Sequence, residues 1–287
     1  MEGKTVLITG ANTGIGKETA RELAKRGARV ILACRNLISA LAARDEIAND
    51  SGNQNVIIMK LDLSSLQSVR DFASEFNNKE SRLDVLVHNA GYASTTTKAV
   101  SVDGIELTVA TNHYGPYLLT HLLIDLMKKS APARIVIVAS SFYRVAFPDL
   151  TKHINPVDCN PWYLYYISKG LNIMFSTELA KRLEGTNVTA NCLHPGMVDS
   201  GIWRNVGMIL KPGLFLWNKL MFVTCAEGAK TSVYLASSED VEGVSGKYYK
   251  DCCEAVPRES IVDPEKCLKL WEESAKVVKL HPSDPKI

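Results

Sequence analysis

Short runs of β-branched and aliphatic residues recur along the chain, and between them apolar residues return every three or four positions. Continuous apolar runs are typical of strands buried on both faces of a parallel sheet, and the longer spacing is typical of helices. Alternating strands and helices predict an α/β protein of Rossmann type, a doubly wound parallel sheet with helices on both faces. The predicted strands are Val6–Ile8, Val30–Leu32, Val56–Met59, Val85–Val87, Ile135–Val138 and Val188–Ala190.

No linker rich in Pro, Gly or Ser divides this pattern, so residues 1–280 are predicted to form a single domain. The Pro-containing end of the chain, 281–287, is predicted to be a loose tail. Residues 201–223 are unusually apolar, but two lysines, a proline and an asparagine interrupt them. This segment therefore lacks the continuous apolar stretch that a membrane-spanning helix requires.

Composition narrows the class of protein further. Apolar residues make up 46% of the chain and charged residues 22%, which excludes a disordered, collagen-like or coiled-coil protein. The net charge of +2 is too small for the chain as a whole to attract nucleic acid or an anionic membrane. Seven cysteines without a C-x-x-C pair argue against a disulfide framework or a metal site, so we expect a cytoplasmic protein. Because a predicted strand follows Met1 so closely, we expect no signal peptide or N-terminal anchor.

Three glycines follow the first predicted strand in the order G-x-x-x-G-x-G, and a helix is predicted over 17–26. Glycines allow the backbone to turn tightly and approach a pyrophosphate, which the N-terminus of the following helix attracts. A glycine-rich turn without a ligand is the alternative, but the complete strand–helix–strand unit favours a dinucleotide site. The residues predicted to contact the cofactor here are Gly10, Asn12, Thr13, Gly14, Ile15, Gly16 and Lys17.

The second predicted strand ends without the acidic residue that proteins preferring NAD commonly use to hold the ribose 2′-hydroxyl. Arg35 at this position has the planar fork that binds a 2′-phosphate, and Lys17 adds a second positive charge. These residues predict NADP(H) as the cofactor, the alternative being that both are solvated surface charges. Asp62, followed by Leu63, is predicted to accept a hydrogen bond from the adenine amino group, to cap the next helix, or to do both.

Tyr165 and Lys169 form a Y-x-x-x-K pair, and the apolar spacing around them predicts a helix over 162–183 with both side chains on one face. A neighbouring ammonium favours the phenolate and so makes tyrosine an acid/base that works closer to neutral pH. The pattern alone is common on exposed helices, so its meaning depends on other residues. Tyr166 is only three positions from Lys169, and we expect it to face elsewhere and pack.

Further motifs accompany this pair in a fixed order: the glycines, Asn89-Ala90-Gly91, Asn112, Ser140-Ser141, Tyr165 with Lys169, and Pro195-Gly196. In this order they resemble the short-chain dehydrogenase/reductase superfamily over nearly all of residues 4–249. The segments Ile8–Ala20, Ala33–Arg35 and His194–Gly196 resemble its retinol dehydrogenase branch. Members of that branch interconvert retinal and retinol or other lipophilic aldehydes and alcohols.

The resemblance implies a role for each matching residue. Tyr165 is the general acid of carbonyl reduction, and Lys169 is its partner and also holds the nicotinamide ribose. Ser141, which the family pattern favours over Ser140, binds the substrate oxygen, and Asn112 holds a water that links Lys169 to solvent. The other cofactor contacts that the resemblance implies are Asn89, Ala90, Gly91, Pro195, Gly196, Val198 and Ser200.

The apolar segment 201–223 lies where this family carries a substrate lid, so Trp203 and Trp217 are predicted to cover a long hydrophobic substrate beside Ser141 and Phe142. A core segment or a dimer contact is the alternative for it. The resemblance thus implies an NADP(H)-dependent oxidoreductase of lipophilic aldehydes and primary alcohols, with retinal and retinol as the leading case. Farnesol-type isoprenoids, steroids and reactive carbonyls are alternative substrates, and a nonenzymatic NADP(H)-binding sensor or adaptor is an alternative of a different class.

The expected partner is a small lipophilic substrate, and no nucleic acid is expected. A homodimer and a peripheral contact with the endoplasmic reticulum or another lipid surface are left open.

Overall fold

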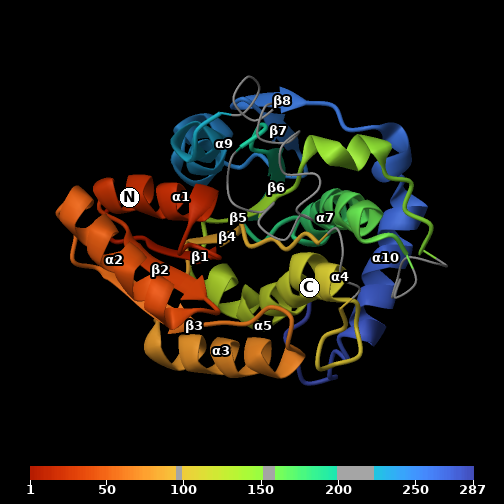
Figure 1. Cartoon of the computed structure of the whole chain (residues 1–287), viewed down its shortest axis with the longest axis horizontal. Helices are drawn as coiled ribbons and strands as arrows, with labels where there is room; N and C mark the ends of the chain where they lie inside the picture. The colour runs from red at the N-terminus through yellow and green to blue at the C-terminus, as the bar shows by residue number, and fades with distance from the viewer. Residues whose placement is uncertain (95–98, 151–158, 199–222) are drawn as a thin grey trace.

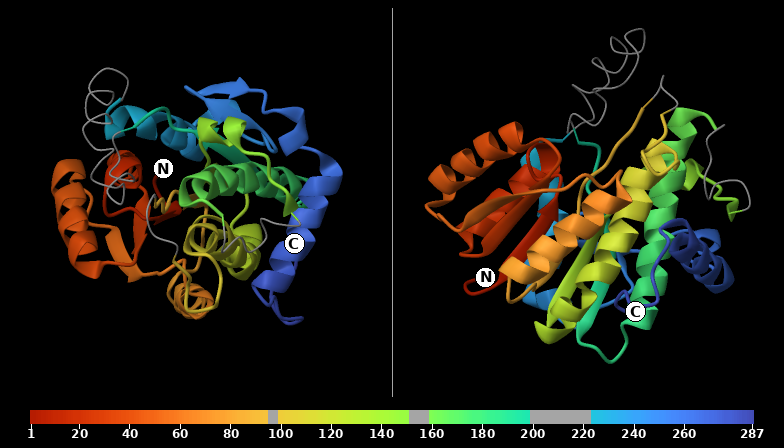
Figure 2. Two further views of the ribbon diagram at one scale, coloured as in Figure 1. Left: turned by 45° about the vertical axis from the view of Figure 1, so that its right-hand side comes forward. Right: turned by 90° about the horizontal axis from the view of Figure 1, so that it is seen from below.

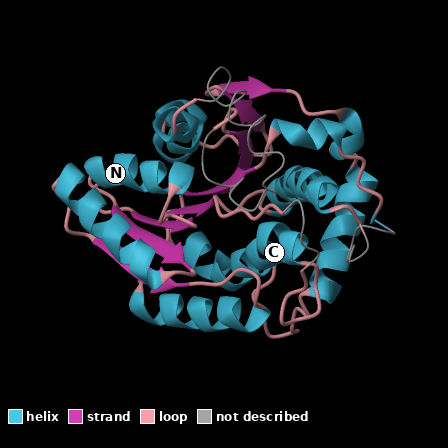
Figure 3. Cartoon of the chain, in the orientation of Figure 1, coloured by secondary structure: helices cyan, strands magenta, loops and turns pink. Residues whose placement is uncertain are grey.

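The computed structural model describes residues 1–94, 99–150, 159–198 and 223–287. Within these ranges, eight strands form one sheet in the order β3-β2-β1-β4-β5-β6-β7-β8 (Figures 1 and 3). All neighbouring strands are parallel except β7 and β8. The strands are β1 Thr5–Thr9, β2 Arg29–Cys34, β3 Val56–Lys60, β4 Val85–His88, β5 Ala133–Val138, β6 Val188–His194, β7 Tyr248–Lys250 and β8 Cys253–Ala255.

Helices cover both faces of the sheet (Figure 3). One face carries α1 (Gly14–Lys25), α2 (Leu37–Ser51) and α9 (Cys225–Ser237), and the other carries α3 (Leu66–Lys79), α5 (Gly115–Lys129) and α7 (Pro161–Arg182). The C-terminal helix α10 (Pro264–Val277) lies against α7 (Figure 2). The short elements are α4 Leu107–Val109, the π-helical turn η1 Ala110–Tyr114, and the 3-10 turns η2 Ser141–Val145, η5 Glu239–Val241 and η6 Glu259–Ile261.

The predicted fold class is confirmed, and each of the six predicted strands is present. The side chains of the central strands alternate between two cores, one under each layer of helices. On β1, Val6 and Ile8 pack on the side of α1, whereas Leu7 packs on the side of α5. Burial on both sides explains why the strands have continuous apolar sequences. The sequence analysis missed β7 and β8, because each has only three residues and therefore no detectable periodicity.

The prediction of a loose C-terminal tail is wrong. The guanidinium of Arg70 on α3 binds the Asp284 carboxylate through two hydrogen bonds of 2.9 Å. Nδ1 of His121 is 3.2 Å from the carbonyl oxygen of Pro285, and the Lys128 ammonium donates to the carbonyl of Lys286 at 3.0 Å. These contacts with α3 and α5 hold residues 281–287 against the domain. None of the helices in the described part of the chain is long and apolar enough to span a membrane.

Trp271 fixes α10 to the rest of the domain. Its ring stacks on Phe175 at 5.9 Å between centroids and meets Tyr117 edge to face at 5.1 Å. The Arg182 guanidinium lies 4.6 Å from the centre of the same ring.

We expect Trp271→Ala to lower the free energy of unfolding by about 3–5 kcal/mol, because it leaves a cavity between α10, α5 and α7. The measurement is urea unfolding followed by circular dichroism. Leu268→Ala on the same helix is the control, since that side chain is 41% exposed and its loss should cost about 1 kcal/mol or less. Equal effects of the two substitutions would show that Trp271 does not anchor the helix.

Candidate active site

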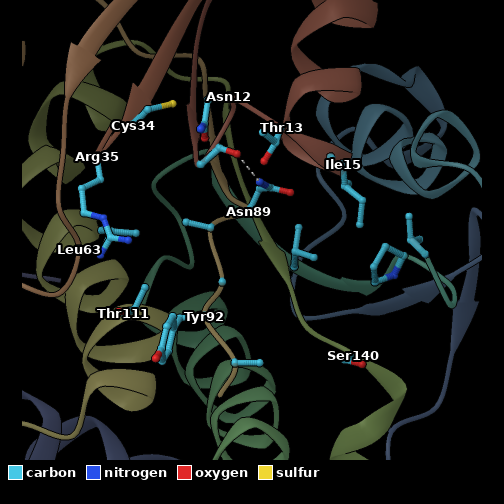
Figure 4. A pocket seen from close by; sticks show the side chains of 18 of the residues that line it. Asn12, Thr13, Ile15, Cys34, Arg35, Leu63, Asn89, Tyr92, Thr111 and Ser140 are labelled. Atoms are coloured by element: carbon cyan, nitrogen blue, oxygen red, sulfur yellow. Dashed lines mark hydrogen bonds between the residues drawn. The ribbon is translucent and has the colours of Figure 1, made fainter. Parts of the chain in front are cut away.

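A pocket of about 560 Å³ opens at the carboxyl ends of the strands, where the strand order reverses between β1 and β4. In an open parallel sheet, this is the place where ligands bind. Figure 4 shows Arg35 near one end of the pocket and Ser140 near the other. The predicted site residues that line it are Gly10, Asn12, Thr13, Gly14, Ile15, Arg35, Asp62, Leu63, Asn89, Ala90, Gly91, Phe142, Tyr165, Lys169, Pro195, Gly196 and Val198.

Other lining residues were not selected from the sequence. Most of them are next to a predicted residue in the sequence. Their position close to the end of a predicted strand is the feature that could have identified them. They are Ala33, Cys34, Asn36, Ser39, Leu61, Tyr92, Ala93, Thr111, Val138, Ala139, Ser140 and Met197.

The glycine loop lies in close contact with the segment after β4. A Cβ atom on Gly10, whose φ is +65°, would lie 2.9 Å from Cα of Ala90. A Cβ on Gly16 would lie 2.3 Å from Nδ2 of Asn89, which donates hydrogen bonds to the carbonyls of Thr9 and Gly10 at 2.9 and 3.3 Å. Larger residues at these glycines would push the two segments apart. Gly16 itself lies under the loop and not among the residues that line the pocket.

The glycine loop leads directly into the N-terminus of α1, and Gly14 and Ile15 of its first turn line the pocket. The N-cap residue Thr13 is extended, and its side chain makes no capping hydrogen bond to any residue that the structure describes. Unsatisfied N–H groups and the helix dipole favour an anion at this position. With the close-packed glycines beside it, this terminus fits the pyrophosphate of a nicotinamide dinucleotide.

The opposite rim is built around the end of β2. Arg35 is exposed there, and Asn12 donates through Nδ2 to the hydroxyl of Ser39 at 2.8 Å. Asn36 caps α2 by accepting hydrogen bonds from the N–H groups of Ile38 and Ser39. Asn12, Arg35, Asn36 and Ser39 therefore form a polar group at one end of the pocket.

Two predictions at this rim are corrected. Lys17 does not line the pocket, because α1 turns its ammonium towards α2, where it forms an ion pair with Glu46. Asp62 does line the pocket but does not cap α3, whose N-cap is Ser65. The Asp62 carboxylate instead accepts hydrogen bonds from the backbone N–H and the hydroxyl of Ser64, at 3.0 and 2.6 Å.

At the other end of the pocket, α7 presents Tyr165 and Lys169 on one face, as predicted from their spacing. The Lys169 ammonium donates to the carbonyl of Val138 at 2.9 Å and lies 5.6 Å from the centre of the Tyr165 ring. Burial lowers the pKa of Lys169 to about 8. Burial also raises the pKa of Tyr165, and a hydrogen bond with Ser140 opposes that rise. The prediction that Lys169 makes Tyr165 an acid/base that works closer to neutral pH stays a prediction.

The structure places Ser140, and not Ser141, at the pocket. Ser140 is extended at the end of β5, lines the pocket and forms the hydrogen bond with Tyr165. Ser141 is the first residue of η2, and its backbone N–H donates to Nδ1 of His194 at 3.1 Å. The start of this turn directs the second serine away from the pocket, so the preference for Ser141 is corrected to Ser140.

Asn112 lies behind the pocket wall, in the π-helical turn η1. Its Oδ1 accepts from the N–H of Tyr92 at 2.7 Å, and its Nδ2 donates to the carbonyl of Tyr92 at 2.9 Å and to the hydroxyl of Ser168 at 3.0 Å. Its neighbour Thr111 lines the pocket instead. The water that Asn112 was predicted to hold stays a prediction.

The predicted lid segment 201–223 lies outside the described residues except for Val223, and so do Ser200, Trp203 and Trp217. Val198 and Val223 form a parallel bridge, and the N–H of Val223 donates to the carbonyl of Met197 at 2.8 Å. The two residues that flank 199–222 therefore meet at the pocket.

Comparison with known proteins assigns the family. The short chain dehydrogenase family model matches residues 4–208, so the chain belongs to the short-chain dehydrogenase/reductase superfamily and, within it, to the retinol dehydrogenase branch. Human retinol dehydrogenase 14 is 44% identical over 98% of this chain and 88% of its own length. Retinol dehydrogenase 12 of Mus musculus is 45% identical over 87% of this chain and 78% of its own.

Solved structures agree with this assignment. A crystal structure of a protein from Mycobacterium paratuberculosis is 30% identical, with a TM-score of 0.77 over 97% of this chain and 94% of that one. An NAD(P)-dependent gluconate 5-dehydrogenase from Beutenbergia cavernae, which has bound NADP at low occupancy, is 25% identical. Its TM-score is 0.71 over 88% of this chain and 96% of that one. The protein is thus an oxidoreductase that uses a nicotinamide cofactor.

The two adjacent serines provide a matched pair of substitutions. We expect Ser140→Ala to lower kcat about 100-fold, because it removes a hydroxyl that can stabilise charge on the substrate oxygen. Ser141→Ala should change kcat by less than about threefold, since its side chain does not line the pocket. Steady-state kinetics of both variants is the measurement, and a larger loss in the Ser141 variant would contradict the placement.

Proposed function

We propose that the protein is an NADP(H)-dependent oxidoreductase that interconverts lipophilic aldehydes and primary alcohols, with retinal and retinol as the leading pair. The observation that carries this proposal is the group formed by Ser140, Tyr165 and Lys169 at one end of a pocket whose other end carries Arg35. The first three residues suit carbonyl chemistry, and the last suits a phosphate.

The geometry supports a different role in the reaction for each of these residues. A bound nicotinamide supplies the hydride in reduction and accepts it in oxidation. In the proposed reaction, the hydroxyls of Ser140 and Tyr165, which lie within hydrogen-bonding distance of each other, donate hydrogen bonds to one carbonyl oxygen, and the neutral Tyr165 phenol gives that oxygen its proton. Lys169 is protonated below pH 8 and lies beside the Tyr165 ring, so its charge favours the phenolate that proton transfer leaves.

Three observations support NADP(H) over NAD(H). The end of β2 carries Arg35 and no carboxylate. Asn12, Asn36 and Ser39 surround it with further hydrogen-bonding groups. The gluconate 5-dehydrogenase with a similar fold has NADP bound.

The substrate class is supported by the relatives and by the pocket wall. Relatives that are 44% and 45% identical are named retinol dehydrogenases, and Phe142 and Tyr92 line this pocket with aromatic rings. Farnesol-type isoprenoids, steroids and reactive carbonyls are the alternative substrates. The peripheral membrane contact, the homodimer and the roles of Trp203 and Trp217 stay predictions.

The function is tested by following NADPH oxidation with all-trans-retinal, farnesal and propanal in parallel. We expect kcat/KM for retinal or farnesal to exceed that for propanal by at least about 100-fold, because each buried CH₂ group contributes to binding. Tyr165→Phe is the control for chemistry and should abolish turnover of all three aldehydes. Tight NADPH binding without turnover of any aldehyde would instead favour the nonenzymatic sensor or adaptor.

Cofactor preference is tested with Arg35→Asp. We expect the Kd of NADPH to rise about 30- to 100-fold, because a charge-assisted contact with the 2′-phosphate is replaced by repulsion, and the Kd of NADH to change little. The matched control is Lys17→Gln, which removes a charge that is paired with Glu46 outside the pocket. Equal weakening of both cofactors by Arg35→Asp would contradict a phosphate contact.

A further inference from the structure

His194 is the last residue of β6, and its side chain is bonded to the start of η2. The residue is buried, with an exposed fraction of 5%. Its Nδ1 accepts a hydrogen bond of 3.1 Å from the backbone N–H of Ser141. A ring nitrogen that accepts from an N–H carries no hydrogen of its own, so the neutral imidazole has its proton on Nε2. His194 does not line the pocket, although the next two residues, Pro195 and Gly196, do.

The surroundings of His194 keep its imidazole neutral. Burial, together with the nearby charges of Lys250, Arg144 and Lys169, lowers the pKa of His194 to about 4, and Asp251 opposes this shift. At neutral pH, Nδ1 is therefore free of a proton and can accept the hydrogen bond from η2.

The hydrogen bond to His194 fixes the peptide group that joins Ser140 to Ser141. The N–H of Ser141 belongs to this planar group, so its direction depends on ψ of Ser140, which is 149°. One residue before Ser140, the N–H of Ala139 donates to the carbonyl of Leu193 at 2.8 Å. Ser140 is thus held from both sides by consecutive residues at the end of β6.

The side chain of Ser140 depends on the same backbone direction. Its hydroxyl oxygen accepts from the N–H of Phe142 at 3.3 Å, and the hydroxyl also forms the hydrogen bond with Tyr165. Because ψ of Ser140 sets the orientation of its side chain relative to η2, a rotated peptide group would move the hydroxyl relative to Tyr165.

From this geometry we propose that His194 is a positioning residue that, by holding the N–H of Ser141, places the Ser140 hydroxyl for catalysis. The inference rests on the proposed aldehyde–alcohol activity, in which Ser140 binds the substrate oxygen. Loss of the acceptor at Nδ1 would leave the partly buried N–H of Ser141 unpaired, and the start of η2 would shift to pair it. A displacement of about 1 Å near the reacting atoms can lower a rate about 100-fold.

Two substitutions separate the acceptor atom from the imidazole as a whole. Oδ1 of asparagine can take the place of Nδ1, whereas Oε1 of glutamine lies one carbon further along the side chain. We expect His194→Asn to keep kcat within about threefold of the wild type and His194→Gln to lower it about 10- to 100-fold. The Kd of NADPH should change less than about twofold in both. Equal losses of kcat in the two variants, or a loss confined to NADPH binding, would overturn the proposal.

A double-mutant cycle with Ser140→Ala tests whether His194 acts through Ser140. In the Ser140→Ala enzyme, His194→Gln should change kcat by less than about twofold, because the hydroxyl that it misplaces is absent. An equal loss in both backgrounds would show a merely structural role and contradict the proposal. His121→Gln is the matched control: this imidazole is also buried and lies 3.2 Å from a backbone carbonyl, but it does not line the pocket. It should leave kcat within about twofold in both backgrounds.

Hydrogen exchange of the Ser141 amide separates this inference from the proposed function. The exchange is followed by NMR without substrate, and we expect it to be at least about tenfold faster in His194→Gln than in the wild type and in His194→Asn. If the wild type turns over none of the aldehydes, the proposed function fails, and the role of His194 is judged on this exchange alone. Equal exchange rates in the wild type and in His194→Gln would overturn the inference.

Discussion

The close contact between the glycine loop and the segment after β4 is the constraint on which the rest of the site depends. β1 and β4 are parallel neighbours at the point where the strand order reverses. The segments that follow these two strands therefore leave the sheet side by side. The side-chain hydroxyl of Thr9 accepts hydrogen bonds from the N–H groups of Asn89 and Ala90, each at 3.1 Å. Because Gly10 and Gly16 have no Cβ, the loop can lie directly on these residues. The first turn of α1 therefore lies at the pocket, which Gly14 and Ile15 line, where its N–H groups favour an anion.

The segment after β4 also leads to the end of the pocket that carries Tyr165 and Lys169. Two residues after Ala90, both backbone groups of Tyr92 are bound by the side chain of Asn112, which also reaches Ser168 on α7. Ser168 is adjacent to Lys169, whose ammonium is bound to the end of β5 at Val138. Buried polar groups that are fully paired are rigid, because loss of one partner leaves another unsatisfied. Residues 89–92 therefore couple the position of the glycine loop to that of α7, and the distance between the two ends of the pocket is set by this connection.

Features that depend on local sequence were predicted well, and features that depend on contacts between distant residues were not. Continuous apolar runs defined the strands because burial on both faces removes every polar position. The i, i+4 spacing put Tyr165 and Lys169 on one face because helix geometry alone requires it. In contrast, Lys17 turns away from the pocket because of Glu46, which is 29 positions further on. Asp284 is held by Arg70, 214 positions earlier. No local pattern contains these pairs.

The sequence motif could not decide which of Ser140 and Ser141 has its hydroxyl at the pocket. Both serines follow β5, and only the point at which the extended chain becomes a turn decides which hydroxyl reaches Tyr165. Burial then determines the chemistry of that pair: it raises the pKa of Tyr165 and lowers that of Lys169, so the phenol keeps its proton at neutral pH. A phenol that donates a hydrogen bond to a carbonyl oxygen gains acidity as charge develops on that oxygen, and the nearby ammonium increases this effect. In the proposed reaction, the acidity of Tyr165 therefore depends on burial and on Ser140 as well as on its spacing to Lys169.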